Sequence, residues 1–403
     1  MLSVIRENVR LAPYTTLRIG GVARYFADID HEDQLCAALQ FAEEKKLPTF
    51  VLGGGSNVLI ADAGFPGVVL HIVNNGITFH KAKKDAALVT AAAGEEWDTV
   101  VQQCVARDLA GVECLSGIPG YVGGTPIQNV GAYGQEVSET IVSVRAFDRH
   151  TKQIVVMTRQ DCLFSYRASI FNTTARDRYI VLEVTYKLKP HGAPTLHYAD
   201  LQRHFARHKK PPTLQEVREA VLAIRASKGM VIVPSDPDCQ SAGSFFKNPM
   251  VTREQFAHIE AAAAEPVPHF PAPNEQVKIP AAWLIEKAGF TKGYERGRVG
   301  ISSKHTLAII NRSNATAREL LAFVAQIQNQ VQERFGLVLV PEPVWIGLEN
   351  QPPIPLAPVL PKVESPPRQT EPSAVPTFPL QPSRKFRKPE HNPLKTTRKK
   401  WFE

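Results

Sequence analysis

The sequence predicts an α+β or mixed α/β protein in at least two parts, followed by a disordered tail. Segments with helical spacing alternate with apolar runs of strand length along most of the chain, with no internal repeat of fixed period. A chain of 403 residues is long enough for two or three domains with real cores. The last part of the sequence is rich in proline and follows neither period.

The first expected elements are a helix at 31–47 and a strand–turn–strand unit at 48–60, PTFVLGGGSNVLI. A strand is expected at 87–94 and an amphipathic helix at 96–109, with Asp98 near its start. A glycine-rich stretch follows at 117–136. Further along we expect strands at 141–149 and 179–188, flanking a loop with FSYRASIF, and a helix at 214–228.

The second part is expected to begin within 225–240, where a polar, proline-containing stretch interrupts the pattern. A helix is predicted at 280–289, with Pro280 near its first turn and Gly289 at its end. HTLAIIN at 305–311 reads as a buried strand. Thr316 and Glu319 form a capping box for a long helix ending near Gly336, and LVLVPEPVW closes the folded part.

More than half of the net charge of +8 belongs to the tail. Residues 349–403 hold ten Lys/Arg against five Asp/Glu, and such a composition cannot bury enough apolar surface to offset the entropy of ordering. We therefore expect a disordered appendix. Its basic end suits a solvated tail without a dedicated partner, or contact with nucleic acid or an anionic membrane surface. The near-neutral body argues against nucleic-acid binding as the main function.

Targeting signals and metal-binding patterns are not found in the sequence. No apolar run reaches eighteen residues and the first residues lack the apolar core of a signal peptide, so a cytoplasmic location is expected. The five cysteines are widely spaced and never form CxxC, which favours reduced thiols over disulfides or a zinc site. No bound metal is expected.

Two glycine-rich segments suit a ligand that carries phosphate. GGGSN at 53–57 can bring the backbone close to a ligand and direct successive N–H groups at a phosphate, although a tight hairpin turn is the alternative. The stretch 117–134 carries six glycines with apolar residues between them, which argues against disorder. Neither has the context of a Rossmann fingerprint, a P-loop or a GxSxG elbow. Two such loops can hold one large, partly phosphorylated cofactor between them.

Six motifs in order carry a resemblance to a known family. They are VLGGGSNVL, SGIPGYVGGTPIQNVGAYG, YRASIF, SAGSFFKNP, EQVKIPAAWLIE and LVPEP. Together they resemble the flavin-dependent UDP-N-acetylenolpyruvoylglucosamine reductases of bacterial cell-wall synthesis, in the subtype with a longer, tyrosine-bearing substrate loop. The resemblance runs from near Thr15 to near Trp345 and leaves only the tail outside it.

The resemblance implies a fold and a reaction. It implies a two-part FAD-binding module of the vanillyl-alcohol-oxidase type at 1–229, divided near residue 70, and a C-terminal α/β substrate-binding domain at 230–348 whose last strand returns to the FAD module. It implies that NADPH reduces FAD, and that reduced FAD passes hydride to the enolpyruvyl ether of UDP-N-acetylglucosamine. The product is UDP-N-acetylmuramate. A monomer is expected.

Three residues match the family's catalytic positions. Hydride addition beside a carboxylate puts negative charge on the carboxylate and the adjacent carbon, and preorganised charges must stabilise it. Arg167 matches the arginine that engages the carboxylate, Glu342 the glutamate that assists its polarisation, and Ser244 the proton donor. An ionised glutamate would repel the substrate, so Glu342 needs burial and a raised pKa. Without the resemblance, an exposed arginine, a surface glutamate and a turn serine remain open.

Other positions match residues that hold the substrate or FAD. Those for the substrate are Tyr166, Tyr198, Lys228, Asn248 and Gln276, and the longer segment GMVIVPSDPDC leaves the exact placement of Lys228 open. Those for FAD are Gly53, Gly54, Gly55, Ser56, Asn57, Ser116, Gly117, Ile118, Pro119, Gly120, Gly123, Gly124, Asn129, Gly131, Ala132, Tyr133 and Arg225.

Two other functions remain as hypotheses. The first is an FAD-dependent oxidase of the same flavin-binding superfamily, which would not need a serine proton donor. The second is a non-catalytic module acting through its basic tail, which a purified protein unable to bind flavin would support.

Overall fold

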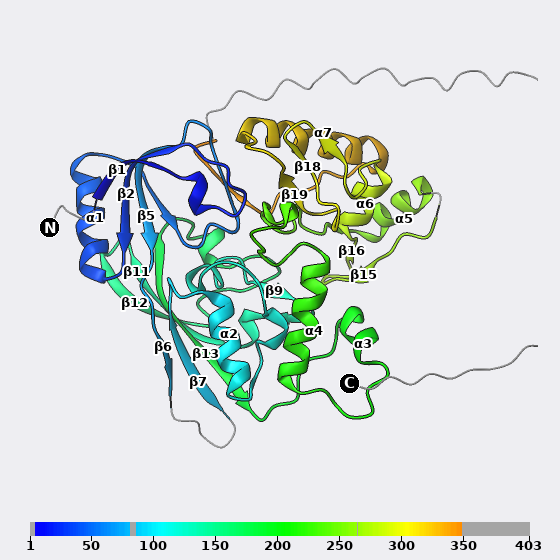
Figure 1. The fold of residues 1–403 in the computed structure, drawn as a ribbon, viewed down its shortest axis with the longest axis horizontal. Coiled ribbons are helices and arrows are strands. Elements are labelled where there is room, and N and C mark those ends of the chain that lie inside the picture. Colours follow the sequence, from blue (N-terminus) through cyan, green and yellow to red (C-terminus); the bar gives the residue numbers. More distant parts are fainter. Residues whose placement is uncertain (1–4, 81–85, 264, 349–403) are drawn as a thin grey trace, which may run out of the picture. The chain divides into compact units, whose positions relative to one another are not determined.

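A computed structural model describes residues 5–80, 86–263 and 265–348 (Figure 1). The expectation of a disordered tail at 349–403 falls outside the described residues. In the described ranges, sheets and helices pack together through several hydrophobic clusters.

The first sheet has the order β1-β2-β5-β3, with β1 antiparallel to β2 and the other neighbours parallel. Helix α1 (Glu32–Glu44) packs on one face, where Leu35 and Ala38 meet Val68 and Leu70 in one cluster. Glu32 and Asp33 in its first turn complement the helix dipole. The strands are β1 (Ile5–Arg10), β2 (Val22–Ile29), β3 (Thr49–Leu52) and β5 (Phe65–Ile72).

The glycine segment 53–57 is not a hairpin turn. Strand β3 pairs with β5, whereas β4 (Val58–Ile60) pairs in parallel with β20 (Val344–Ile346), so the two strands on either side of the glycines belong to different sheets. The glycines therefore carry the chain from one sheet to another.

The second sheet is antiparallel with the order β12-β11-β13-β7-β6, and β8 pairs with the end of β13. Helix α2 (Trp97–Ala106) buries Val100, Val101 and Cys104 in the same cluster as this sheet. The strands are β6 (Ile77–Phe79), β7 (Ala87–Ala92), β8 (Leu109–Ala110), β11 (Ile141–Asp148), β12 (Gln153–Thr158) and β13 (Tyr179–Pro190).

The expected helix at 214–228 is confirmed as α4 (Leu214–Ser227), which begins with a capping box formed by Thr213 and Glu216. It packs with α3 (Ala199–Phe205) and with the glycine-rich stretch. That stretch contains β9 (Gly131–Ala132) and β10 (Gln135–Glu136). Short 3₁₀ helices occur at Ala12–Tyr14, Glu113–Leu115, Val122–Gly124, Val137–Glu139, Ile170–Asn172 and Pro237–Cys239.

The C-terminal part is built around α7 (Ala317–Phe335), drawn in orange-yellow in Figure 1, whose capping box of Thr316 and Glu319 is confirmed. The strand expected at 305–311 is shorter than predicted. Pro280, expected near the first turn of its helix, is the N-cap residue just before the helix Ala281–Lys287. The remaining elements are β14 (Met250–Val251), α5 (Arg253–Ala262), β15 (Phe270–Pro271), β16 (Val277–Lys278), α6 (Ala281–Lys287), β17 (Glu295–Arg296), β18 (Val299–Ile301) and β19 (Ile309–Asn311).

Polar contacts join this part to the N-terminal segment. The Asp62 carboxylate accepts the backbone N–H groups of Ala317 (2.7 Å) and Arg318 (3.1 Å) at the start of α7. The Asn311 amide donates to the carbonyl of Leu17 at 2.9 Å. An anion at a helix N-terminus is stabilised by the free N–H groups and the dipole, so Asp62 fixes α7 against β4.

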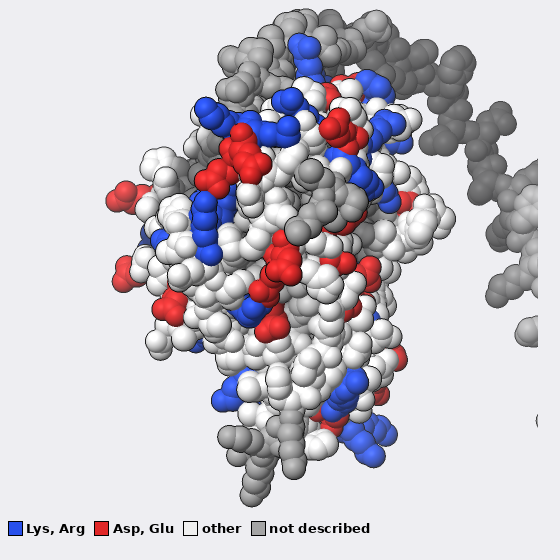
Figure 2. All heavy atoms as spheres, turned by 90° about the vertical axis from the view of Figure 1, so that its left-hand side faces the viewer, with Lys and Arg blue, Asp and Glu red and all other residues white. Residues whose placement is uncertain are grey.

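The described surface mixes charges of both signs. Figure 2 shows lysine and arginine side chains interspersed with aspartate and glutamate on the face that it draws. Pairs such as Arg145–Glu32 and Lys152–Glu43 (2.8 Å) join elements across the surface. None of the helices in the described ranges is long and apolar enough to cross a membrane.

Candidate active site

A cavity of about 1150 Å³ lies where segments far apart in the sequence meet. Its lining brings together the first glycine segment, part of the glycine-rich stretch, the SYRASIF loop and the chain around β20. Residues predicted from the sequence that line it are Gly53, Gly54, Gly55, Ser56, Asn57, Ile118, Gly120, Gly123, Gly124, Arg167 and Glu342.

The two glycine loops approach each other so closely that larger residues would clash. A Cβ atom added to Gly54 would lie 2.8 Å from the Cα of Gly120, and one on Gly55 would lie 1.9 Å from the carbonyl oxygen of Tyr14. Gly55 also has φ +61°, a conformation that side chains disfavour. The glycines therefore allow two stretches of bare backbone to face one cavity.

Helix α2 holds the second loop in place through its first turn. The backbone N–H of Trp97 donates to the Gly120 carbonyl (3.0 Å), and its indole N–H donates to the Leu115 carbonyl (3.1 Å). The Asp98 carboxylate accepts the Gly117 N–H (2.6 Å) and both terminal nitrogens of Arg218 on α4 (2.7 and 2.8 Å). Partial burial opposes ionisation, but these bonds and the Arg218 charge hold the pKa of Asp98 below its usual value.

A buried nitrogen beside this loop lacks a partner. Arg225 on α4 donates from one terminal nitrogen to the Met230 carbonyl (2.8 Å), while its Nε is buried without a hydrogen bond in the described structure. That Nε lies 3.4 Å from where a Cβ of Gly117 would be. A buried donor without an acceptor costs stability, so an acceptor from a ligand suits this position. The cavity and the bare loops fit a large phosphorylated cofactor such as FAD, with the Arg225 donor beside them but outside the cavity lining.

Several positions predicted for the cofactor lie outside the cavity lining: Ser116, Gly117, Pro119, Asn129, Gly131, Ala132, Tyr133 and Arg225. The hydroxyl of Ser116 donates to the Glu113 carbonyl (2.6 Å), and the amide of Asn129 bonds with Glu136, Ser165 and the N–H of Ser138. These two side chains are buried and bonded inside the protein, so they support the shape of the loop.

Arg167 is held in a specific orientation beside the cavity. Its backbone has φ +53°, in the left-handed region, within the short loop closed by a bridge between Ser165 and Ala168. Its Nη2 donates to the Gly131 carbonyl (2.8 Å), and its Nε lies 3.3 Å from a carboxylate oxygen of Glu342. The two side chains are 20% and 14% exposed, so the pair is mostly removed from water but open to the cavity.

Glu342 has the environment that a neutral carboxyl group requires. Burial raises its pKa, and the nearby charges of Arg167 and Lys247 only partly oppose this effect. Its backbone N–H donates to the Phe245 carbonyl (2.8 Å), one residue after Ser244. The protonated form is therefore favoured at higher pH than for a glutamate in water.

Ser244 lies in a loop attached directly to the Glu342 segment. Gly243 before it has φ +69°, and its N–H donates to the Ser241 hydroxyl (3.2 Å). Phe245 and Phe246 after it are buried. No hydrogen bond joins the Ser244 hydroxyl to another residue in the described ranges. Its position does not match a helix cap, and Ser244 is not one of the residues that line the cavity.

The predicted substrate residues form two groups. Tyr166 lies close enough to Asn248 for Asn248 to affect its pKa, and the amide oxygen of Asn248 accepts the N–H of Ala281 at the start of α6 (2.9 Å). Gln276 precedes β16 and is half-buried. On the other side, Lys228 ends α4 and pairs with Asp200 of α3 at 2.7 Å.

Tyr198 begins the α3 segment, 42% exposed, with its ring edge against Tyr133 at 5.2 Å between centroids. The Lys228 ammonium lies 5.8 Å from the centre of the Tyr133 ring. The structure thus gathers Tyr133, Tyr198 and Lys228 beside α4.

Sequence reasoning missed residues whose role depends on tertiary contacts. Lys247 and Tyr121 line the cavity, and Asp98 fixes the loop, although Lys247 and Tyr121 stand inside quoted motifs and Asp98 was noted only as a helix start. The position of Lys247 and Tyr121 inside the motifs was the signal from which a role for them could have been predicted.

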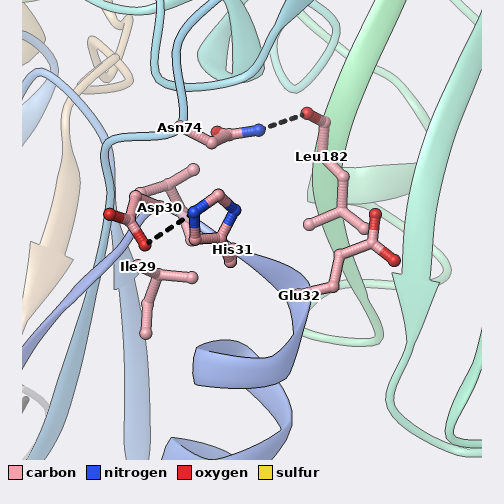
Figure 3. A pocket seen from close by; sticks show the side chains of 7 residues that line it. Ile29, Asp30, His31, Glu32, Asn74 and Leu182 are labelled. Carbon is pink, nitrogen blue, oxygen red and sulfur yellow. Dashed lines mark hydrogen bonds and ion pairs between the residues drawn. The ribbon is translucent and has the colours of Figure 1, made fainter.

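A second, smaller cavity of about 110 Å³ lies before α1 (Figure 3). Asp30 and His31 approach to 3.9 Å, and the Asn74 amide donates to the Leu182 carbonyl (3.0 Å). In the described residues, no group of three or more His, Cys, Asp or Glu can hold a metal ion. The large cavity is therefore the candidate active site.

Comparison with known proteins gives matches over both parts of the chain. Residues 23–156 match the domain described as an FAD binding domain, and residues 235–346 match the C-terminal domain of UDP-N-acetylenolpyruvoylglucosamine reductase.

Three similar proteins carry that reductase name. A relative from Thermobifida fusca is 44% identical over 356 residues, covering 86% of this chain and 99% of its own length. One from Streptomyces coelicolor is 47% identical over 355 residues, covering 85% and 90%. The crystal structure of the reductase from Thermus caldophilus is 25% identical, with a TM-score of 0.58, covering 85% of this chain and 99% of that one.

Proposed function

The chain belongs to the family of UDP-N-acetylenolpyruvoylglucosamine reductases, and on this premise we propose how its own side chains carry out the reaction. It is an FAD-dependent oxidoreductase of peptidoglycan precursor synthesis that reduces the enolpyruvyl group with NADPH. When bound, FAD supplies the hydride chemistry. We propose that the glycine loops, Tyr133 and Arg225 hold FAD, and that the substrate reaches it past Arg167 and Ser244.

Arg167 binds and orients the substrate's carboxylate. Its planar guanidinium is charged at any working pH and presents several donors in a fixed geometry. Burial raises the pKa of Glu342, and in its protonated form this carboxyl group donates a hydrogen bond to the same carboxylate instead of repelling it. Together they stabilise the negative charge that develops there during reduction.

Ser244 delivers the proton to the carbon next to the carboxylate. A hydroxyl is a weak acid, so the transfer requires close approach and a strongly basic carbon. Gly243 leaves open space beside the serine, and the bond between Phe245 and Glu342 fixes its loop relative to the carboxylate site. The observation that carries this assignment is that Glu342 contacts Arg167 through its side chain and Phe245, the residue after Ser244, through its backbone N–H.

The remaining predicted residues hold the rest of the substrate. Lys228 and Tyr198 suit the diphosphate, and Tyr166, Asn248 and Gln276 the sugar or the nearer phosphate. We further propose a division at 1–229 and 230–348, a monomeric state and a cytoplasmic location.

The test is turnover of wild type and Ser244→Ala with NADPH and UDP-N-acetylenolpyruvoylglucosamine. We expect the variant to oxidise NADPH normally in a single half-reaction, while product formation falls by about 100-fold or more, within the range for loss of general acid catalysis. Equal turnover of both forms would show that Ser244 is only a loop residue. Flavin binding by both proteins without reduction of this substrate, but with oxygen-dependent oxidation of an alcohol, would favour the oxidase alternative.

A further inference from the structure

Lys247 is a cation in the candidate active site that the assignment above does not use. Lys247 is one of the residues that line the large cavity, together with Arg167 and Glu342. Among the described residues, no carboxylate lies within the 4.0 Å ion-pair distance of its ammonium group. A partly buried, unpaired cation in a cavity lacks a counter-charge that an anionic ligand can supply.

The backbone around Lys247 is fixed to the segment that carries Glu342. Phe246 forms an antiparallel bridge with Pro341, the N–H of Lys247 donates to the Val340 carbonyl (2.9 Å), and the N–H of Glu342 donates to the Phe245 carbonyl (2.8 Å). Ser244 and Lys247 thus lie at the two ends of a short segment that pairs with the segment containing Glu342. The charge of Lys247 also acts on the Glu342 carboxyl, where it opposes the effect of burial on the pKa.

We propose that Lys247 is a second cation for the substrate's carboxylate and acts with Arg167 on the charge formed during reduction. This proposal rests on the function proposed above, since it uses the same substrate and the same end of the cavity.

The charge balance of the reaction supports two cations. The substrate's carboxylate carries one negative charge, and a hydride added to the terminal alkene carbon brings an electron pair. The carbon–carbon π pair then moves onto the carbon bearing the carboxylate, which gives an enediolate-like species with two negative charges. A proton added to that carbon returns the charge to one. With Glu342 neutral, Arg167 and Lys247 together match the two charges at the most demanding point.

The experiment compares Lys247→Met, Lys247→Arg and the control Lys45→Met with wild-type holoenzyme. Methionine keeps an unbranched stem and removes the charge. The control removes an exposed lysine at the end of α1, with the same change in net charge. Three quantities are measured: retention of FAD, the dissociation constants of the substrate and of UDP-N-acetylglucosamine, which lacks the carboxylate, and the single-turnover rate of substrate reduction.

We expect Lys247→Met to retain FAD and to bind UDP-N-acetylglucosamine normally. Its affinity for the substrate should fall about tenfold, a typical effect for a hydrogen bond to a charged group. Its reduction rate should fall by about 100-fold, as for loss of one preorganised donor. Lys247→Arg should recover most of that rate, and Lys45→Met should match wild type.

Three results would overturn the proposal. Loss of FAD would assign Lys247 to the cofactor, and equal weakening of both sugar nucleotides would assign it to the diphosphate. An unchanged affinity and rate in Lys247→Met would remove any role. If wild type itself fails to reduce the substrate, the proposed function falls instead, so the two failures are distinguishable.

Discussion

The protonation state of one buried carboxyl group controls how the site receives an anionic substrate. Glu342 is 14% exposed, and burial raises its pKa despite the Arg167 guanidinium 3.3 Å away and the charge of Lys247. Burial also raises the pKa of the nearby Tyr166, where the charge of Arg167 opposes the shift and that of Glu342 adds to it. The group is thus kept nearer neutrality than an exposed glutamate would be.

We expect Glu342→Gln to remove the decline in kcat/KM that the wild type shows as pH rises. Because the pKa is raised, the wild-type carboxyl is protonated below it and becomes a repulsive carboxylate above it, so kcat/KM for the substrate should fall as pH rises through that pKa. Glutamine has nearly the same shape and keeps a donor without ionising. The measurement is kcat/KM against pH for both proteins.

The variant should be less active than wild type at low pH and should show no decline from this group at higher pH. If the declining limb is unchanged in Glu342→Gln, another group causes it and the role of the neutral carboxyl is wrong. NADPH oxidation by the free holoenzyme is the control, because it does not involve the substrate's carboxylate.

Residue types in the motifs predicted which side chains matter but not how they meet. Arg167 and Glu342 stand 175 positions apart in the sequence, and only the fold brings them to 3.3 Å. Lys247 was quoted inside SAGSFFKNP and received no role, since its place beside Glu342 depends on the bridge between Phe246 and Pro341. Side-chain direction in an irregular loop has no period from which it can be predicted.

At the scale of elements, α2 and α4 clamp the second glycine loop through Asp98. Asp98→Ala leaves the Arg218 guanidinium, 8% exposed, without its partner and frees the Gly117 N–H. We expect a loss of stability of about 2 kcal/mol, below the cost for a fully buried pair because the Asp98 side chain is 36% exposed. Faster release of FAD should accompany it. The measurements are the thermal midpoint of the apoprotein and the rate of flavin release.

Asp33→Ala is the matched control, because Asp33 also lies in the first turn of a helix and is exposed. It should lower stability by at most about 1 kcal/mol through the helix dipole and leave flavin release unchanged. Flavin release from Asp98→Ala at the wild-type rate would contradict the clamp.

The neighbouring glycines Gly53 and Gly54 provide a second test at this scale. A Cβ at Gly54 would lie 2.8 Å from the backbone of Gly120, whereas one at Gly53 would lie 3.8 Å from Tyr121, an ordinary contact. Gly54→Ala is therefore expected to push the loops apart and lower the thermal midpoint of the apoprotein by several degrees, and Gly53→Ala to leave it nearly unchanged. Equal midpoints would show that the loops have room to move.

Patterns of neighbouring residues predicted where helices begin better than they predicted what the glycine segment connects. Thr316 and Glu319 correctly predicted the start of α7, because a capping box depends only on residues close together in the sequence. The glycines at 53–57 were open to a hairpin interpretation, and the partners that exclude it, β5 and β20, lie elsewhere in the sequence. The strand predicted at 305–311 is short because only Ile309–Asn311 finds a partner strand.

At the scale of the whole chain, the site depends on a strand from the C-terminal end of the described protein. Val344–Ile346 pairs with Val58–Ile60, directly after the first glycine segment, and the N–H of Val344 donates to the Asn57 carbonyl (2.9 Å). Trp345 and Gly347 line the cavity from the same strand. The family resemblance implied such a return, but the residue pattern does not predict it, since parallel pairing across almost 300 residues leaves no local signal.

Two truncations separate the contribution of this strand from that of the tail. A chain ending at Leu348 keeps β20 and every residue that lines the cavity, so its kcat/KM and its flavin content should stay within about twofold of the full chain. A chain ending at Pro343 loses β20, uncovers one side of the cavity and removes the buried side chains of Ile346 and Leu348. Burial of two such side chains contributes about 3 to 6 kcal/mol, a large part of the stability of a domain. This shorter chain should therefore fail to retain FAD.

Activity and flavin absorbance of the three purified proteins test both expectations. A large loss of activity in the chain ending at Leu348 would give the tail a role in turnover, and normal flavin retention in the chain ending at Pro343 would show that β20 is dispensable.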